Sequence, residues 1–201
     1  MKKQFGTSRF ALGVLAIICA LAFASTASAK NPKEVTMKIH KNENGKTELV
    51  IETGKHENDC PPGQVSEAGC IKVKRNEKSE IYFHLIGNTK CHLDSGTDWE
   101  LSAIYLGGYN SDSKPKPGKF GFGDTADTDY DKVNADFNIA IRQSGLVTQH
   151  PTSTAKRLVI NDENQHEYVV WYKIEAKCER TDGRPAHVRT TDPRVRNSGT
   201  D

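Results

Sequence analysis

The sequence lacks a large excess of charge of either sign. Its 28 lysine and arginine residues are nearly balanced by 26 aspartate and glutamate residues, so the formal net charge at pH 7 is only +2. Binding to nucleic acid without sequence preference depends on a strongly basic face. The composition therefore predicts that the partner is not a nucleic acid.

Long apolar runs are also missing, apart from one near the N-terminus. Three basic residues in the first nine positions precede an apolar stretch from Phe10 to Ala24, and Ala27-Ser28-Ala29 follows it. About fifteen apolar residues fall short of the roughly 20 that a membrane-spanning helix needs, whereas this three-part layout is that of a signal peptide. We expect residues 1–29 to be removed, which leaves a periplasmic or secreted chain with no transmembrane segment.

Recognisable catalytic signatures are absent. The sequence has no nucleophile elbow, no pair of histidines at helical spacing and no phosphate-cradling loop. The glycines of GKFGFG at 118–123 are in the wrong order for dinucleotide binding. These absences favour a binding protein over an enzyme, although residues distant in sequence can still converge in a catalytic site.

Cysteine pairs at the short spacing of a zinc site are missing too. Once Cys19 is removed with the signal peptide, four cysteines are left: Cys60, Cys70, Cys91 and Cys178. An even number in an exported protein favours two disulfides. We favour Cys60–Cys70, because Pro61, Pro62 and Gly63 already make that segment a turn, and this leaves Cys91–Cys178; the other two connectivities stay open.

Helical periodicity is scarce, since no segment longer than ten residues keeps a 3.6-residue period. Alternation of apolar and polar residues instead predicts strands at 35–39, 47–52, 70–74, 80–87, 98–108, 137–141, 156–161 and 166–178. Asn44-Gly45 predicts a hairpin turn between the first two. The pattern predicts an all-β, antiparallel two-sheet sandwich, with an immunoglobulin-like arrangement as one form of it.

Two of these strands show which face should enter the core. In the last one, a single face carries Tyr168, Val170, Tyr172, Ile174, Ala176 and Cys178. In 98–108, the apolar face carries Trp99, Leu101, Ala103 and Tyr105. Cys178 is thus in phase with the core, as a buried disulfide requires. Val169 and Trp171 make the other face of the last strand apolar, which indicates a central strand or a covered outer face.

Two segments of the chain resist assignment to strands. The first, 107–136, is inserted in the predicted domain 30–178, and a connection of that length is usually functional or disordered. The second is the tail 179–201, which mixes both charges with few apolar residues. We expect the tail to be flexible or to dock as an edge strand through Val188 and Val195.

Aspartates are concentrated in the long loop and suggest a cation site. The candidate ligands are Asp124, Asp127, Asp129, Asp131 and Asp136. Counting from Asp127, the sixth and twelfth residues are Lys132 and Asn138, so the helix-flanked calcium loop is rejected and only an irregular calcium site is left. The competing interpretation is that these carboxylates solvate the loop and cap its turns.

Aromatic residues share that loop. Tyr109, Phe120, Phe122 and Tyr130 lie among its glycines, and Trp171 follows in the last strand. Aromatic faces stack on sugar rings and also serve protein interfaces. The alternative is that Phe120 and Phe122 anchor the loop in the core.

The sequence therefore predicts an exported, non-catalytic binding or interaction protein of the bacterial envelope. Its acidic and aromatic loop would contact a polysaccharide or a protein, with self-association through an unpaired strand edge as one form of the latter. No cofactor other than calcium is expected. The alternative is a small secreted hydrolase or enzyme inhibitor, in which paired carboxylates of the loop act as acid and base.

Overall fold

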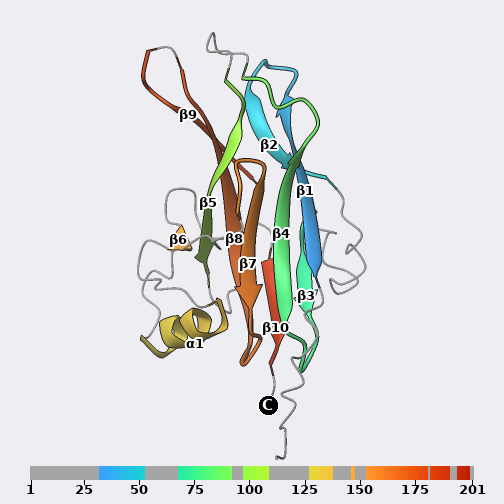
Figure 1. The fold of residues 1–201 in the computed structure, drawn as a ribbon. Helices are drawn as coiled ribbons and strands as arrows, with labels where there is room; N and C mark the ends of the chain where they lie inside the picture. Colours follow the sequence, from blue (N-terminus) through green and yellow to red (C-terminus); the bar gives the residue numbers. More distant parts are fainter. Residues whose placement is uncertain are drawn as a thin grey trace, which may run out of the picture.

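The computed structural model describes residues 32–52, 68–91, 97–108, 127–137, 146–147, 153–180, 182–190 and 194–199. Their regular elements are ten strands and one helix (Figure 1). The elements are β1 Lys33–Lys41, β2 Thr47–Ile51, β3 Ile71–Val73, β4 Ser79–Ile86, β5 Glu100–Gly107, α1 Asp127–Phe137, β6 Leu146–Val147, β7 Arg157–Asp162, β8 Glu167–Cys178, β9 Ala186–Arg189 and β10 Arg194–Ser198.

The strands form two sheets. The four-stranded sheet has the order β2-β1-β4-β7, and the six-stranded sheet has the order β3-β10-β8-β5-β6 with β9 beside β8. The prediction of purely antiparallel sheets is wrong, because β1 pairs with β4 and β3 pairs with β10 in parallel. After β2 the chain enters the six-stranded sheet as β3 and then returns to the four-stranded sheet as β4. The neighbours β1 and β4, like β3 and β10, are therefore not joined by hairpins. Both sheets are therefore mixed, and an immunoglobulin-like order is not established.

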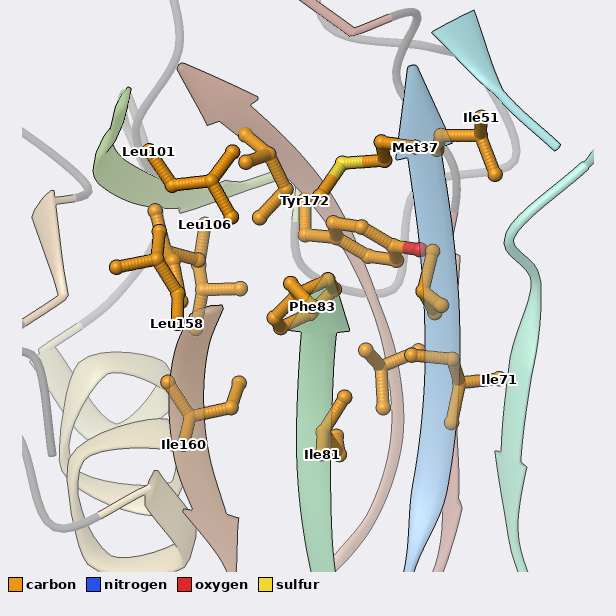
Figure 2. Packing of buried hydrophobic residues seen from close by; sticks show 14 of the residues in the cluster. Met37, Ile51, Ile71, Ile81, Phe83, Leu101, Leu106, Leu158, Ile160 and Tyr172 are labelled. Carbon is orange, nitrogen blue, oxygen red and sulfur yellow. The ribbon is translucent and has the colours of Figure 1, made fainter. Parts of the chain in front are cut away.

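One hydrophobic core lies between the two sheets. Figure 2 shows Met37 and Phe83 of the four-stranded sheet pointing toward Tyr172 of the six-stranded sheet. The rings of Phe83 and Tyr172 lie 5.3 Å apart between centroids. In β4, buried and partly exposed residues alternate, as the period of two requires. Each large apolar side chain buried in this way stabilises the fold by about 1.5 to 3 kcal/mol.

The buried face of β5 differs from the prediction. A β-bulge lies between Leu101 and Ala103, because Leu101 pairs with Ala176 and Ala103 with the adjacent Glu175. The extra residue shifts the phase of the strand. Beyond it, Ile104 and Leu106 are fully buried, whereas Tyr105 is only half-buried. The expectation that Tyr105 shares the core face of Trp99 is therefore wrong.

The predicted core face of β8 is confirmed. All six of its residues, from Tyr168 to Cys178, are buried, and Trp171 on the other face is only 3% exposed. β5 pairs with one edge of β8. Along the other edge, β10 pairs with the first part of the strand and β9 with the last part. β8 is therefore central, as its apolar residues on both faces indicated.

The tail and the long loop contain more structure than the sequence indicated. β9 and β10 belong to the six-stranded sheet, and β10 lies between β3 and β8 rather than at an edge. The segment expected to be an irregular loop contains α1, whose buried Val133 and Phe137 lie one helical turn apart. Phe137 ends this helix and does not begin a strand; 138–141, like 109–126, lies outside the described residues.

The predicted Cys91–Cys178 disulfide is present. It joins β8 to the segment after β4, with the two Cα atoms 6.2 Å apart and a separation of 87 positions in the sequence. Cys60 lies outside the described residues, so the second pairing, Cys60–Cys70, stays a prediction.

The predicted signal peptide, 1–29, also lies outside the described residues. In the part of the chain that the structure describes, no helix has the length and apolarity to cross a membrane.

Candidate functional site

A pocket opens where the core face of the β1–β2 hairpin changes from apolar to polar. Paired residues on this face are first Met37 with Ile51 and then Ile39 with Leu49. The next pair is Lys41 with Thr47, beside the turn (Figure 1). Because this last pair is polar, the space between the sheets is open to solvent at this end.

The hairpin turn itself is held by local hydrogen bonds. The side chain of Asn42 accepts the backbone N–H groups of Asn44 and Lys46 through Oδ1, at 3.1 and 2.9 Å. Gly45 adopts φ = 75°, a conformation that glycine tolerates best. This wall of the pocket is therefore defined by the backbone, as the predicted Asn-Gly turn requires.

The opposite wall is the segment between β4 and β5. Cys91 N–H donates to the carbonyl of Thr97 at 2.9 Å, and Trp99 N–H donates to the carbonyl of Thr89 at 2.7 Å. The disulfide ties the same segment to β8. Trp99 is 2% exposed, so it forms the floor of the pocket rather than a projecting platform.

The charges around this wall are mainly positive. The carboxylate of Asp98 contacts Lys90 Nζ at 3.0 Å and Lys156 Nζ at 3.2 Å. Hydrogen bonds from both lysines lower the pKa of Asp98, so it is ionised at neutral pH. Lys41, on the other wall, forms no ion pair with a described residue. Two ammonium groups thus contact one carboxylate and a third lies on the opposite wall, a net positive charge that favours an anionic ligand.

The cavity has a volume of about 180 Å³. Its lining consists of Ile39, Lys41, Gly45, Thr47, Asn88, Lys90 and Trp99. Pockets for drug-sized ligands usually measure about 300 to 1,000 Å³, so this one suits a single ring or a terminal group. Apolar atoms at the base and amide, hydroxyl and ammonium groups at the rim match a small polar ring that carries a negative charge.

Most of the predicted aromatic surface lies outside the described residues and stays a prediction. Tyr109, Phe120 and Phe122 lie outside them, and so does the side chain of Tyr130, although its backbone belongs to α1. Trp171 is buried, and the guanidinium of Arg194 lies 4.8 Å from its ring centroid. Trp171 is therefore a covered residue with a cation–π contact and not an exposed platform.

The predicted calcium ligands are not brought together where they are described. Asp124 and the side chains of Asp127 and Asp129 lie outside the described residues. Asp131 is exposed, whereas Asp136, about 140° further around the helix, is fully buried. In the described ranges, no group of three or more histidine, cysteine or acidic residues is placed to hold a metal ion.

Asp136 instead fastens α1 to the sheets. Its Oδ1 accepts the backbone N–H of Gln165 at 2.7 Å, and its Oδ2 accepts the backbone N–H of His166 at 3.3 Å. Its carbonyl accepts the N–H of Glu163 at 2.7 Å. These bonds hold the end of the helix on the β7–β8 turn, so the role of Asp136 is structural.

A second buried carboxyl group, Asp162, was not singled out from the sequence. The amide of Asn197 donates to Asp162 Oδ1 at 2.9 Å and to Asp136 Oδ2 at 3.4 Å. Burial raises the pKa of Asp162 to about 8, and the charge of Asp136 adds to this shift. The only sequence signal was its position at the end of a predicted strand, where an aspartate usually signals a turn.

Glu175 forms a third polar cluster, on the outer face of β8. Its carboxylate accepts Arg189 Nε at 2.7 Å and contacts His187 Nδ1 at 3.1 Å. Burial acts to raise the pKa of Glu175, but the hydrogen bonds and charges of Arg189 and His187 outweigh it, and the pKa is lowered. The cluster joins β9 to β8.

A scan against protein-family models and a search of curated proteins found no match to this chain.

Proposed function

We propose that this chain is an exported, non-catalytic binding protein that recognises an acidic sugar of an envelope polysaccharide through the pocket beside the β1–β2 turn. The observation that carries the proposal is the combination of an apolar floor with a lysine-rich rim in a cavity of about 180 Å³. A disulfide holds one wall and a hydrogen-bonded turn holds the other. Such preorganised walls reduce the entropy lost on binding.

The chemistry of the rim explains the choice of ligand. A sugar ring has an apolar face and an edge of hydroxyl groups, and a uronic acid adds a carboxylate. Ile39 and Trp99 offer the apolar contact, while Asn88 and Thr47 offer hydrogen-bond partners for hydroxyls. The ammonium groups of Lys41 and Lys90 then attract the carboxylate.

The expectations that the described residues do not test belong to the same proposal. These are the signal peptide, an envelope location, an immunoglobulin-like relationship, the Cys60–Cys70 disulfide, self-association and calcium binding. The loop 107–136 stays a proposed second contact for a polysaccharide or protein partner. The hydrolase alternative needs two close carboxylates in a pocket, and no observation in the described residues favours it.

Calorimetry on the oxidised mature protein tests the proposal. We expect uronic-acid oligosaccharides to bind and neutral oligosaccharides of equal length to bind more weakly or not at all. Lys41→Gln and Lys90→Gln should each weaken binding by about fivefold to tenfold, since a hydrogen bond to a charged group contributes roughly 1 to 1.5 kcal/mol net at an exposed site.

Lys46→Gln is the matched control, because Lys46 lies on the same turn but pairs with Glu48 and does not line the cavity. This variant should bind like the unmodified protein. Equal affinities of Lys41→Gln and the unmodified protein for every oligosaccharide would overturn the proposed site. A glycan array on which no acidic glycan is retained would overturn the ligand class.

A further inference from the structure

A second hollow, of about 610 Å³, lies on the outer face of the six-stranded sheet over β3, β10 and β8. Lys72 lies between Ile71 and Val73, which are fully buried, so its side chain points away from the core. Arg196 likewise lies between the buried Val195 and Asn197. Two basic side chains thus stand on the floor of one groove, and both are half-buried.

These two cations occupy paired positions on neighbouring strands. Arg196 is directly opposite Lys72 in the parallel β3–β10 pair and opposite Val169 in the β10–β8 pair. Neighbouring strands lie about 4.8 Å apart, and like charges at opposite positions destabilise a sheet. The repulsion between Lys72 and Arg196 therefore lowers the stability of the fold when no anion lies between them.

No described residue neutralises this pair. Neither Lys72 nor Arg196 forms an ion pair with a described side chain, whereas Lys33, Lys38 and Lys78 each do. Glu167 also lines the hollow, but it is exposed and pairs with Ser198, two residues along β10 from Arg196. The two cations outnumber this single carboxylate, so the groove has a net positive charge.

We propose that this groove is a binding site for a tetrahedral oxyanion, a phosphate or sulfate group, held between Lys72 and Arg196. The guanidinium of Arg196 presents parallel N–H donors that match two oxygens of such a group, and the Lys72 ammonium supplies a point charge beside it. The hydroxyl of Ser198, which also lines the groove, supplies one more donor. Binding of the anion would remove the repulsion between the paired cations.

The size of the groove indicates how the anion is carried. A hollow of about 610 Å³ exceeds what one inorganic anion fills. Ester-linked phosphate or sulfate on a larger molecule would use the remaining space, including the apolar surface of Val169. The groove lies over β3 and β10 and the lysine pocket lies beside the β1–β2 turn. These elements are toward opposite ends of the sandwich (Figure 1), so this site goes beyond the proposed function and does not depend on it.

Nuclear magnetic resonance titration of the oxidised mature protein tests this site. The probes are inorganic phosphate, inorganic sulfate, a phosphorylated monosaccharide and the same monosaccharide without phosphate. We expect the amide signals of Lys72, Val73, Arg196 and Asn197 to shift with the first three probes and not with the fourth. Tighter binding of the ester than of inorganic phosphate supports an ester-linked ligand, and equal binding supports a free anion.

Substitutions complete the test. Arg196→Gln should weaken phosphate binding by about tenfold or more, as expected for the loss of a charge-assisted hydrogen bond, and Arg196→Lys should restore only part of the affinity. Lys74→Gln is the control, because Lys74 is exposed just beyond β3 and does not line the groove. Absence of amide shifts with both anions, or equal weakening by Lys74→Gln, would overturn the site. Uronic-acid binding at the pocket lined by Lys41 is measured separately and does not depend on either result.

Discussion

At the scale of single residues, Asp162 is a carboxyl group placed where it is costly to ionise. The side chain is 1% exposed, and its Oδ2 has no hydrogen-bond partner among the described residues. Asn197 Oδ1, in the same cluster, also has none. Burial, followed by the nearby charge of Asp136, raises the pKa of Asp162 to about 8 against hydrogen bonds from Asn164 and Asn197. A proton on Oδ2 would supply the donor that this cluster lacks.

The raised pKa gives a direction for the pH dependence of stability. Unfolded aspartate titrates near pH 3.9, so between about pH 4 and pH 8 the folded state binds the extra proton. The free energy of unfolding should therefore fall as pH rises through this window, by up to about 1.4 kcal/mol per pH unit. Asp162→Asn, which mimics the protonated form, should remove this decline in urea unfolding curves measured between pH 5 and 8. Parallel curves for the variant and the unmodified protein would contradict this interpretation.

Glu175 acts in a different pH window and does not confuse this measurement. Its pKa is lowered in the folded state, because Arg189 and His187 outweigh the effect of burial. The stability that it contributes is present above the ordinary glutamate pKa of about 4.3 and is lost as the pH falls through the folded value. A decline between pH 5 and 8 is therefore not due to Glu175.

At the scale of elements, β9 and β10 form an interrupted strand along one edge of β8. Thr190 lies at the interruption and is 4% exposed. Its backbone N–H donates to the carbonyl of Ile174 at 2.9 Å, and its hydroxyl accepts the N–H of Ile174 at 3.0 Å. The side chain thus replaces a backbone acceptor where the regular ladder stops.

Removal of this hydroxyl should weaken both strands. Thr190→Val keeps the shape of the side chain but leaves the buried N–H of Ile174 without its acceptor, which costs about 1 to 3 kcal/mol. Urea unfolding should show this loss, and Thr190→Ser should retain most of the stability. A Val variant as stable as the unmodified protein would mean that water or another group satisfies Ile174.

The sequence predicts the elements better than their pairing. The Asn-Gly turn and the period of two identify the β1–β2 hairpin and the core face of β8, because both signals are local. The bulge at Ser102 is not visible in the alternation of apolar and polar residues, so the prediction that Tyr105 faces the core was wrong. The parallel pairs β1–β4 and β3–β10 depend on contacts between distant segments. α1 was missed because its two buried anchors, Val133 and Phe137, are too few to give a helical period.

At the scale of the whole molecule, the candidate pocket was beyond prediction for the same reason. Lys41 and Thr47 belong to one hairpin, while Asn88, Lys90 and Trp99 come from a segment about 50 residues further along the chain. No spacing in the sequence shows that these segments face each other. The aspartates and aromatics of 107–136 suggested a binding site because they cluster in the sequence. Asp136 instead holds α1 on the β7–β8 turn, and Trp171, predicted to act with them, is buried.

The Cys91–Cys178 disulfide links the fold to this pocket. It fastens the segment that carries Lys90 and Trp99 to β8, the central strand. Thr97 strengthens the junction, since its hydroxyl donates to the carbonyl of Glu179 at 3.0 Å. Stability and ligand affinity should therefore depend on the same crosslink.

Replacement of both cysteines, Cys91→Ala with Cys178→Ala, should lower both properties at once. In the loop-entropy model, a crosslink across 87 residues stabilises the fold by about 4 to 5 kcal/mol, a large share of the roughly 5 to 15 kcal/mol typical of a domain. Urea unfolding should show this loss, and affinity for a uronic-acid oligosaccharide should fall even where the variant is fully folded, because Lys90 and Trp99 are no longer held. Lys41→Gln should lower the affinity alone. A folded double variant with unchanged affinity would show that the hydrogen bonds of Thr89 and Thr97 hold this wall without the disulfide.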